Sequence, residues 1–429
     1  MHGTNELLHI PLHIPMERND FYMKKKLFAI FLLLPLLVCT ARPVLATETA
    51  PIYPYDFAFE EYWYQEAAPD TAFPAATFSS SLPHKSCLLM EASTGRVLYE
   101  NNADDRLPIA SVTKVMATLL IAESIDDGRL SLQDIVTVSE RAASMGGSQV
   151  FLEPGEQMTV DDLLKSLIVV SANDATVALA EAVCGSEEAF IAEMNEKAEA
   201  LGLTNTHFVN TNGLPVEGHF SSARDVAITT RALLEHPMVL NYTNIWMDTI
   251  RNGAFGLANT NKLIRFYQGA NGMKTGFTSE AGYCLSGTAK REDMQLIAVV
   301  LGSPTSDDRF ALAKQLLDFG FAHYAITVPE ATLPESLPVK RGVTDSVGLT
   351  CQIPSLLTEK GGKGNITQSL SLPDSVEAPV EKGQVVGTLT FLRDGEALAS
   401  VPVRAASGVE KIGYGTVLGR ILTNIFGVW

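Results

Sequence analysis

Residues 106–118 read RLPIASVTKVMAT, and this stretch decides how the rest of the chain is interpreted. Its apolar residues, followed on to position 120, recur at helical spacing: Val112, Val115, Met116, Leu119 and Leu120. That spacing predicts a buried helix that begins near Ser111. Lys114 follows Ser111 by three positions, which brings a hydroxyl and an amine to one face of the helix.

The pair Ser111 and Lys114 suggests nucleophilic chemistry. A serine hydroxyl attacks only when a base removes its proton, and a lysine is such a base when burial or a neighbouring cation lowers its pKa. At the start of a helix, Ser111 also aims the positive end of the helix dipole at the developing oxyanion. The pattern alone is weak, because it arises by chance about once or twice in such a chain. A capping serine beside a solvated lysine is the alternative.

Helix and strand patterns alternate around this stretch. Residues 87–100 alternate apolar and polar around Thr94-Gly95 and predict a hairpin. One helix is predicted after Thr159, which opens a sequence like a capping box, and the next reaches a C-cap at Gly185. Further segments are strand-like at 281–288 and 295–301 and helical at 309–319. We therefore expect an α+β or mixed α/β domain over residues 84–325.

The composition changes near Val328, where short β-type runs cut by Gly, Pro and Asp-Gly begin. Asp394-Gly395 between two alternating runs is a strong hairpin signal, so a small all-β domain is expected over residues 326–410. From Val417 the apolar residues recur in pairs every four positions. Residues 411–429 therefore predict an amphipathic helix that lies on a membrane surface; a helix packed on the β domain is the alternative.

The first 46 residues predict an export signal. Lys24, Lys25 and Lys26 precede an apolar run at 27–38, and small residues end the segment at Ala46. The run is too short for a stable membrane span. Met23 directly precedes the lysines, which suggests that residues 1–22 are an upstream extension. Residues 47–83 are rich in Pro, Ala, Ser, acidic and aromatic residues, and we expect a leader or linker there.

Composition limits the classes of function. The 429 residues, 46% of them hydrophobic, predict two or three domains rather than a disordered chain. With 32 Lys and Arg against 49 Asp and Glu the formal net charge is −17, which argues against a nucleic-acid partner, because phosphates require clustered cations. The cysteines beyond the export signal are widely spaced and form no C-x-x-C pair, so no metal site is expected.

Two further stretches gather reactive side chains. Ser171-Ala172-Asn173 lies between two predicted helices, where Ser171 could relay a proton and Asn173 could bond a substrate amide; an ordinary turn with Asn173 as N-cap is the alternative. Lys274-Thr275-Gly276 opens a strand-like segment. A cation, a hydroxyl and a glycine that allows close approach form a dock for a carboxylate. A nearby Lys274 would also lower the pKa of Lys114.

The ordered set Ser-x-x-Lys, Ser-x-Asn, Lys-Thr-Gly resembles that of penicillin-binding proteins and class A β-lactamases. The flanking sequences resemble the low-molecular-weight penicillin-binding proteins that are serine-type D-Ala-D-Ala carboxypeptidases: residues 106–118, 190–202 (FIAEMNEKAEALG), 206–210 (THFVN), 213–215 (GLP) and 272–284 (GMKTGFTSEAGYC). The resemblance runs from about residue 84 to the end, since 378–387 (APVEKGQVVG) resembles that family's C-terminal domain. It implies a β-lactamase/transpeptidase-like catalytic domain followed by a small all-β domain.

The resemblance also implies residue roles. Ser111 would be the acylated nucleophile and Lys114 its base, with the other two motifs supplied by Ser171, Asn173, Lys274, Thr275 and Gly276. The backbone N–H groups of Ser111 and Phe277 would form the oxyanion hole, although some relatives have His where this chain has Phe277. Arg309 resembles an arginine that helps hold the substrate carboxylate; a solvated helix start is the alternative. Gly147-Ser148 would lie in a loop beside the site. No metal or organic cofactor is implied.

The implied activity is removal of the terminal D-Ala from peptidoglycan pentapeptide stems on the outer face of the bacterial membrane or in the wall, with β-lactams acylating Ser111. A D,D-endopeptidase would use the same residues. A class A β-lactamase has Ser-Asp-Asn where this chain has Ala172, and its Glu-x-x-Leu-Asn sequence is not found downstream of Asn173. A non-catalytic wall-binding protein would not need the complete set of motifs.

Overall fold

The computed structural model describes residues 77–361 and 365–426. The predicted export signal, most of the predicted leader and the last three residues of the chain therefore lie outside the described residues. Among the helices that the structure describes, each is too short or too polar to cross a membrane.

A five-stranded antiparallel sheet, in the order β2-β1-β9-β8-β7, forms the frame of the first domain. Its strands are β1 (Ser86–Glu91), β2 (Val97–Asn101), β7 (Ala270–Thr278), β8 (Gly282–Arg291) and β9 (Met294–Ser303). The predicted hairpin at Thr94-Gly95 is confirmed by the pairing of β1 with β2. The central strand β9 is buried along most of its length, which explains its near-continuous apolar run.

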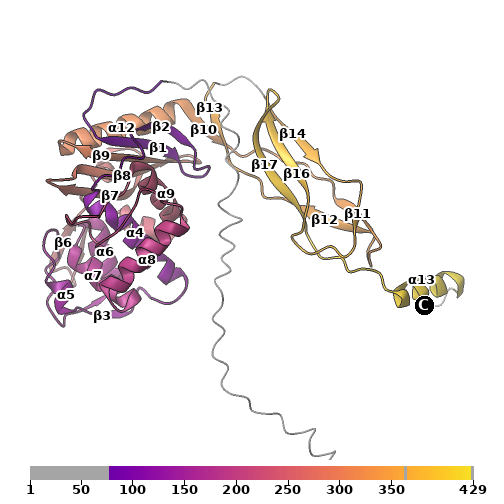
Figure 1. Ribbon diagram of the computed structural model, residues 1–429, viewed down its shortest axis with the longest axis horizontal. Helices are drawn as coiled ribbons and strands as arrows, with labels where there is room; N and C mark the ends of the chain where they lie inside the picture. The colour runs from indigo at the N-terminus through magenta and orange to yellow at the C-terminus, as the bar shows by residue number, and fades with distance from the viewer. Residues whose placement is uncertain (1–76, 362–364, 427–429) are drawn as a thin grey trace, which may run out of the picture. The chain divides into compact units, whose positions relative to one another are not determined.

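Helices cover both faces of this sheet (Figure 1). α12 (Ser306–His323) packs on one face with Leu296, Ala298 and Val300, while the alternate residues of β9 point into the core formed with α9 (Ala223–Leu234). This alternation follows from the two-residue period of a strand. We refer to the elements from β1 to α12 as the α/β domain.

α4 (Lys114–Asp126) lies at the centre of the α/β domain and is buried on nearly all sides, which explains its run of apolar residues. Around it lie α6 (Val160–Val169), α7 (Asn173–Cys184), α8 (Glu187–Ala200) and α9. The predicted helix ends are confirmed: Thr159 Oγ1 accepts from the Asp162 N–H at 3.1 Å, and Gly185 ends α7 at a φ of 82°. Because capping contacts are local, they could be recognised in the sequence.

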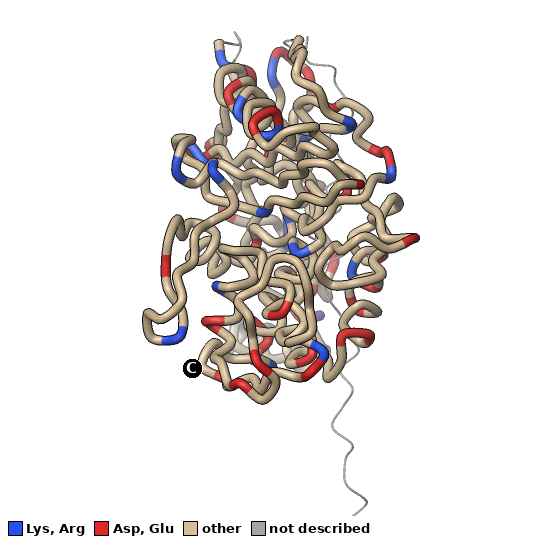
Figure 2. Tube along the Cα trace, turned by 90° about the vertical axis from the view of Figure 1, so that its left-hand side faces the viewer, with Lys and Arg blue, Asp and Glu red and all other residues tan. Residues whose placement is uncertain are grey.

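Short elements connect the main helices and strands of the α/β domain. They are η1 (Ala110–Thr113), β3 (Ile135–Thr137), α5 (Glu140–Ala143), β4 (Gln157–Thr159), η2 (Pro237–Val239), α10 (Leu240–Thr243), β5 (Met247–Ile250), β6 (Phe255–Ala258) and α11 (Leu263–Phe266). Of these, η1 and α5 bear directly on the chemistry. Figure 2 shows that Lys and Arg positions are interspersed with Asp and Glu positions along the described trace.

The C-terminal part, here called the β domain, is a six-stranded sheet in the order β14-β16-β17-β12-β11-β15. Its strands are β11 (Ser336–Lys340), β12 (Ser346–Thr350), β14 (Ile366–Ser371), β15 (Val376–Glu377), β16 (Val385–Arg393) and β17 (Glu396–Ala405). The hairpin predicted at Asp394-Gly395 joins β16 to β17, with both turn residues at positive φ. β10 (Tyr324–Thr327) pairs separately with β13 (Leu356–Glu359).

The amphipathic helix predicted near the C-terminus is present as α13 (Tyr414–Phe426). Its described aliphatic side chains are exposed by 39% to 66%: Val417, Leu418, Ile421, Leu422 and Ile425. Together the two parts confirm the expected fold class, a mixed α/β domain followed by a small all-β domain.

Candidate active site

The Ser-x-x-Lys motif lies at a strained turn. Ser111 belongs to η1, directly before α4, and the preceding residue Ala110 has a φ of 48°, in the left-handed region that non-glycine residues rarely adopt. Two glycines allow neighbouring chains to approach this turn. A Cβ on Gly276 would lie 2.9 Å from the Ser111 nitrogen, and one on Gly213 would lie 1.9 Å from the Ala110 oxygen. The backbone at both glycines therefore packs closely against the turn that carries Ser111, here called the nucleophile turn.

Lys114 is fully buried, and three acceptors surround its amine. Its Nζ donates to Ser111 Oγ at 3.0 Å, to Asn173 Oδ1 at 2.6 Å and to the carbonyl of Asn212 at 3.0 Å. Burial lowers the pKa of Lys114 well below the ordinary lysine value, and the charge of Lys274 lowers this pKa further, while Asp174 opposes both. The alternative of a solvated lysine is wrong, and the geometry suits a neutral amine that accepts the Ser111 proton.

Asn173 is the first residue of α7 and reaches Lys114 rather than capping its helix; the N-cap position belongs to Ala172. Its Nδ2 donates to the Gly146 carbonyl at 2.7 Å, and its backbone N–H donates to the Ser148 carbonyl at 2.7 Å. A Cβ on Gly147 would lie 2.9 Å from that Nδ2. The loop expected beside the site thus fixes the orientation of the Asn173 amide.

Ser171 occupies the left-handed region with a φ of 66° and is only 4% exposed. Its Oγ is buried and has no hydrogen-bond partner within the part of the chain that the structure describes. A buried hydroxyl without a partner is costly in a folded protein, so such groups call for an explanation. A hydroxyl held ready for a substrate or for proton transfer provides one.

The Lys-Thr-Gly motif lies on β7, at the edge of the sheet. Lys274 is 3% exposed and donates to the Thr275 carbonyl at 2.9 Å. Burial, together with the charge of Arg309, lowers the pKa of Lys274 to about 7. Thr275 Oγ1 donates to Thr260 Oγ1 at 2.7 Å. This strand therefore brings a cation and a hydroxyl to the nucleophile turn that Gly276 touches.

Phe277 and Arg309, at the end of this strand and on α12, differ in exposure. The Phe277 side chain is 53% exposed, and its ring centroid lies 4.3 Å from that of Tyr283. Arg309, on α12, is 5% exposed and donates to the carbonyls of Gly276 at 3.2 Å and Cys284 at 3.1 Å. The alternative of a solvated helix start is wrong for Arg309. From the protein interior, its guanidinium holds the backbone of the Lys-Thr-Gly motif in place.

Two residues of the candidate active site, Asn212 and Asp174, were not predicted from the sequence. The backbone carbonyl of Asn212 accepts from Lys114 and, at 3.3 Å, from Ser111 Oγ. Asp174 is fully buried, and its carboxylate accepts the N–H groups of Val150 at 3.0 Å and Leu152 at 3.1 Å. Asn212 lies between two stretches that resemble the family, and this position was the available signal. Its contact is made by the backbone carbonyl, however, which is the same in every type of residue.

Two family models match the chain. That of the D-alanyl-D-alanine carboxypeptidases matches residues 74–305, and that of the penicillin-binding protein 5 C-terminal domain matches residues 327–411. The D-alanyl-D-alanine carboxypeptidase DacF of Bacillus subtilis is 46% identical over 354 residues, which cover 80% of this chain and 91% of that protein.

Solved structures agree. Penicillin-binding protein 5 of Haemophilus influenzae is 32% identical, with a TM-score of 0.69, over 78% of this chain and 100% of that one. Penicillin-binding protein D2 of Listeria monocytogenes, in its ampicillin-bound form, is 34% identical with a TM-score of 0.53; the match covers 57% of this chain and 100% of that one.

Proposed function

Because the chain belongs to the family of D-alanyl-D-alanine carboxypeptidases, we propose that it removes the terminal D-Ala from peptidoglycan pentapeptide stems through an acyl-enzyme on Ser111. One observation carries the assignment of residues: the fully buried Lys114 amine lies 3.0 Å from Ser111 Oγ, in surroundings that lower its pKa. This is the arrangement that serine acylation without a histidine requires.

In the acylation step, Ser111 Oγ attacks the carbonyl carbon of the penultimate D-Ala and its proton passes to Lys114 Nζ. The backbone N–H groups of Ser111 and Phe277 receive the oxyanion. Collapse of the tetrahedral intermediate breaks the peptide bond, and the leaving amine of the terminal D-Ala takes up a proton. Ser171, whose Oγ has no partner among the described residues, is suited to relay it.

In the deacylation step, water attacks the ester carbonyl, and Lys114 again accepts the proton. The Ser111–acyl bond then breaks, Ser111 Oγ regains a proton, and the shortened stem leaves as a carboxylic acid. Asn173 would hold the substrate amide in both steps. Lys274 and Thr275 would bind the terminal carboxylate of the substrate, with Arg309 adding positive charge from behind the strand.

The proposal extends to β-lactams. The Listeria monocytogenes relative was solved in its ampicillin-bound form. We expect the β-lactam carbonyl to acylate Ser111 in the same way, with the ring nitrogen as the leaving group. Because that nitrogen stays tethered to the acyl group, hydrolysis would stall and a stable adduct would accumulate.

The division of the chain is also part of the proposal. Residues 1–46 would direct export and 47–83 would form a leader, so that the catalytic domain at 84–325 and the β domain at 326–410 act outside the cytoplasm. Residues 411–429 would bind the membrane surface, since α13 exposes Leu418, Ile421 and Ile425. Co-sedimentation with anionic vesicles tests this: wild type should pellet and Ile421→Asp should not, and a wild type that stays in the supernatant would refute the anchor.

The activity is tested by D-Ala release from a pentapeptide stem. Wild type should release D-Ala and Ser111→Ala should not, while Ser369→Ala, at an exposed serine of the β domain, serves as the matched control. After exposure to penicillin, mass spectrometry should find one penicilloyl adduct, located on Ser111. Release by Ser111→Ala at the wild-type rate, or an adduct elsewhere, would overturn the assignment. A cross-linked stem dimer as substrate distinguishes the endopeptidase alternative.

A further inference from the structure

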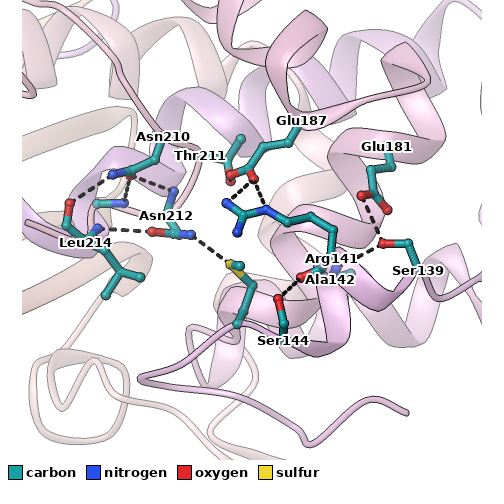
Figure 3. A network of polar contacts seen from close by, with 12 residues as sticks. Ser139, Arg141, Ala142, Ser144, Glu181, Glu187, Asn210, Thr211, Asn212 and Leu214 are labelled. Carbon is teal, nitrogen blue, oxygen red and sulfur yellow. Dashed lines mark hydrogen bonds and ion pairs between the residues drawn. The ribbon is translucent and has the colours of Figure 1, made fainter. Parts of the chain in front are cut away.

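A short turn at residues 210–214 supplies the Asn212 carbonyl that both Ser111 and Lys114 contact. Asn210 shapes this turn from within (Figure 3): its Oδ1 accepts the Gly213 N–H at 2.7 Å, and its Nδ2 donates to the Leu214 carbonyl at 2.9 Å. These bonds fix the shape of the turn. The position of the turn relative to α4 has to be set by contacts with other elements.

One such contact runs through Thr211 to an ion pair. Thr211 is fully buried, and its Oγ1 donates to Glu187 Oε1 at 2.9 Å. The other oxygen of Glu187 accepts from Arg141 Nε at 3.0 Å and from an Arg141 terminal nitrogen at 2.8 Å (Figure 3). Glu187 is 4% exposed, whereas the Arg141 side chain is 57% exposed. A buried carboxylate requires such partners, so the turn is tied firmly to α8 and α5.

The same ion pair also reaches the second acceptor of Lys114. Arg141 lies on α5, and the chain that leaves α5 supplies the carbonyls of Gly146 and Ser148 that hold Asn173. α5 is in turn fixed to α7, because Ser139 Oγ donates to Glu181 Oε1 at 2.9 Å (Figure 3). Both acceptors other than Ser111, the Asn212 carbonyl and Asn173 Oδ1, are therefore held by segments that meet at Arg141 and Glu187.

We propose that Arg141, Glu187 and Thr211 are positioning residues that hold the Lys114 amine on Ser111 Oγ and so set the rate of acylation. The hydrogen bonds described for these three residues do not include Ser111 or Lys114. They act through the Asn212 carbonyl and through the loop that holds Asn173. The inference rests on the proposed function, because it assigns these residues a part in that reaction.

Loss of the tie should change both the size and the pH dependence of the acylation rate. When the turn relaxes, Nζ is held less well on Ser111 Oγ, so the plateau rate falls. A carbonyl acceptor favours the charged amine, so its withdrawal moves the acid limb of the profile to lower pH. The charged groups that act on Lys114 are Lys274 on β7 and Asp174 on α7, and both remain in place. Partial unfolding would reduce the active fraction without moving the limb.

The experiment measures the acylation rate constant with a fluorescent penicillin from pH 5 to pH 9, normalised to the titrated amount of active sites. Thr211→Val removes the hydroxyl at nearly constant volume, and Thr211→Ser restores it. We expect Thr211→Val to lower the plateau about 10-fold and to shift the acid limb down by about half a pH unit, and Thr211→Ser to remain near wild type. Arg141→Met should lower the plateau about threefold.

One control variant repeats the arginine change away from the turn. Arg129→Met, at an exposed arginine paired with Asp127, should match wild type. If Thr211→Val does not fold, the exposed Arg141→Met decides the question alone. The inference would be overturned if Arg141→Met and Thr211→Val both showed the wild-type plateau rate and the wild-type position of the acid limb. A wild type that takes no label would instead refute the proposed function.

Discussion

The α/β domain and the β domain differ in what they bury. The first encloses charged side chains around its site: Lys114, Asp174, Glu187, Lys274 and Arg309. In the described residues of the β domain, Thr358 is the single polar side chain among those that are buried, and the core consists of residues such as Leu389, Phe391, Val401 and Val403. Burial of a charge is costly unless it is paired, so a cluster of buried charges indicates chemistry rather than stability.

This difference predicts opposite responses to substitution. In the α/β site, loss of a buried polar group should change the rate of acylation more than the stability. In the β domain, loss of a buried apolar group should change the stability and leave the rate per folded molecule unaltered.

The largest effect is expected from Lys114→Met, which removes the buried amine at similar side-chain length. Acylation by penicillin should slow about 10³-fold, because the base is lost. The melting temperature should stay equal or rise, since a buried ionisable group is replaced by an apolar one. Rapid-mixing kinetics and thermal unfolding measure the two quantities, with Lys290→Met at an exposed position as the control. Acylation at the wild-type rate would exclude Lys114 as the base.

Phe391→Ala tests the β domain. Phe391 is fully buried, so its truncation should cost about 3–5 kcal/mol of stability. The control Val385→Ala, at a side chain that is 51% exposed, should cost under about 0.5 kcal/mol. The measurement is denaturant unfolding together with acylation kinetics. A fall in the acylation rate of folded Phe391→Ala would show that acylation in the α/β domain depends on the packing of the β domain.

Gly276→Ala tests the close packing of backbone against the nucleophile turn. The added Cβ would lie 2.7 Å from the Ile109 carbonyl and 2.9 Å from the Ser111 nitrogen, so the turn has to move. Acylation should slow about 10²-fold. Gly256→Ala is the matched control, because a Cβ there meets nothing within 4 Å. Equal rates in the two variants would mean that the close approach of β7 is not required.

The smallest effect concerns the pH dependence of stability. The pKa of Lys274 is lowered to about 7 in the folded protein, whereas an unfolded lysine stays protonated up to about pH 10.4. Above pH 7 the unfolded state therefore binds more protons, and stability rises with pH by up to about 1.4 kcal/mol per pH unit. Lys274→Met lacks this contribution. The difference in unfolding free energy between Lys274→Met and wild type should therefore change between pH 7 and pH 9. Parallel unfolding curves for the two proteins would contradict the lowered pKa.

Sequence reasoning predicted what is local and what depends on residue type. The caps at Thr159 and Gly185, the turn at Asp394-Gly395 and the motif around Ser111 each lie within a few positions, so each could be recognised. The fold class followed from the order of such segments and from the family resemblance.

The remaining parts of the site depend on tertiary structure. Arg141 and Glu187 are 46 positions apart, and their pairing depends on the packing of both α5 and α8 against α7 rather than on any local pattern. The Asn212 contribution comes from a backbone carbonyl, which every residue type carries. The burial of Arg309 depends on how α12 crosses the sheet, and the sequence around it fitted a solvated helix start equally well.

The place of β7 at the edge of its sheet has a consequence for solubility. An edge strand exposes unpaired backbone groups to which another molecule can add, and natural sheets counter this with inward-pointing charges. Lys274, buried near the middle of this strand, is such a charge. The residue proposed to bind the substrate carboxylate would therefore also discourage edge-to-edge association of two copies of this protein.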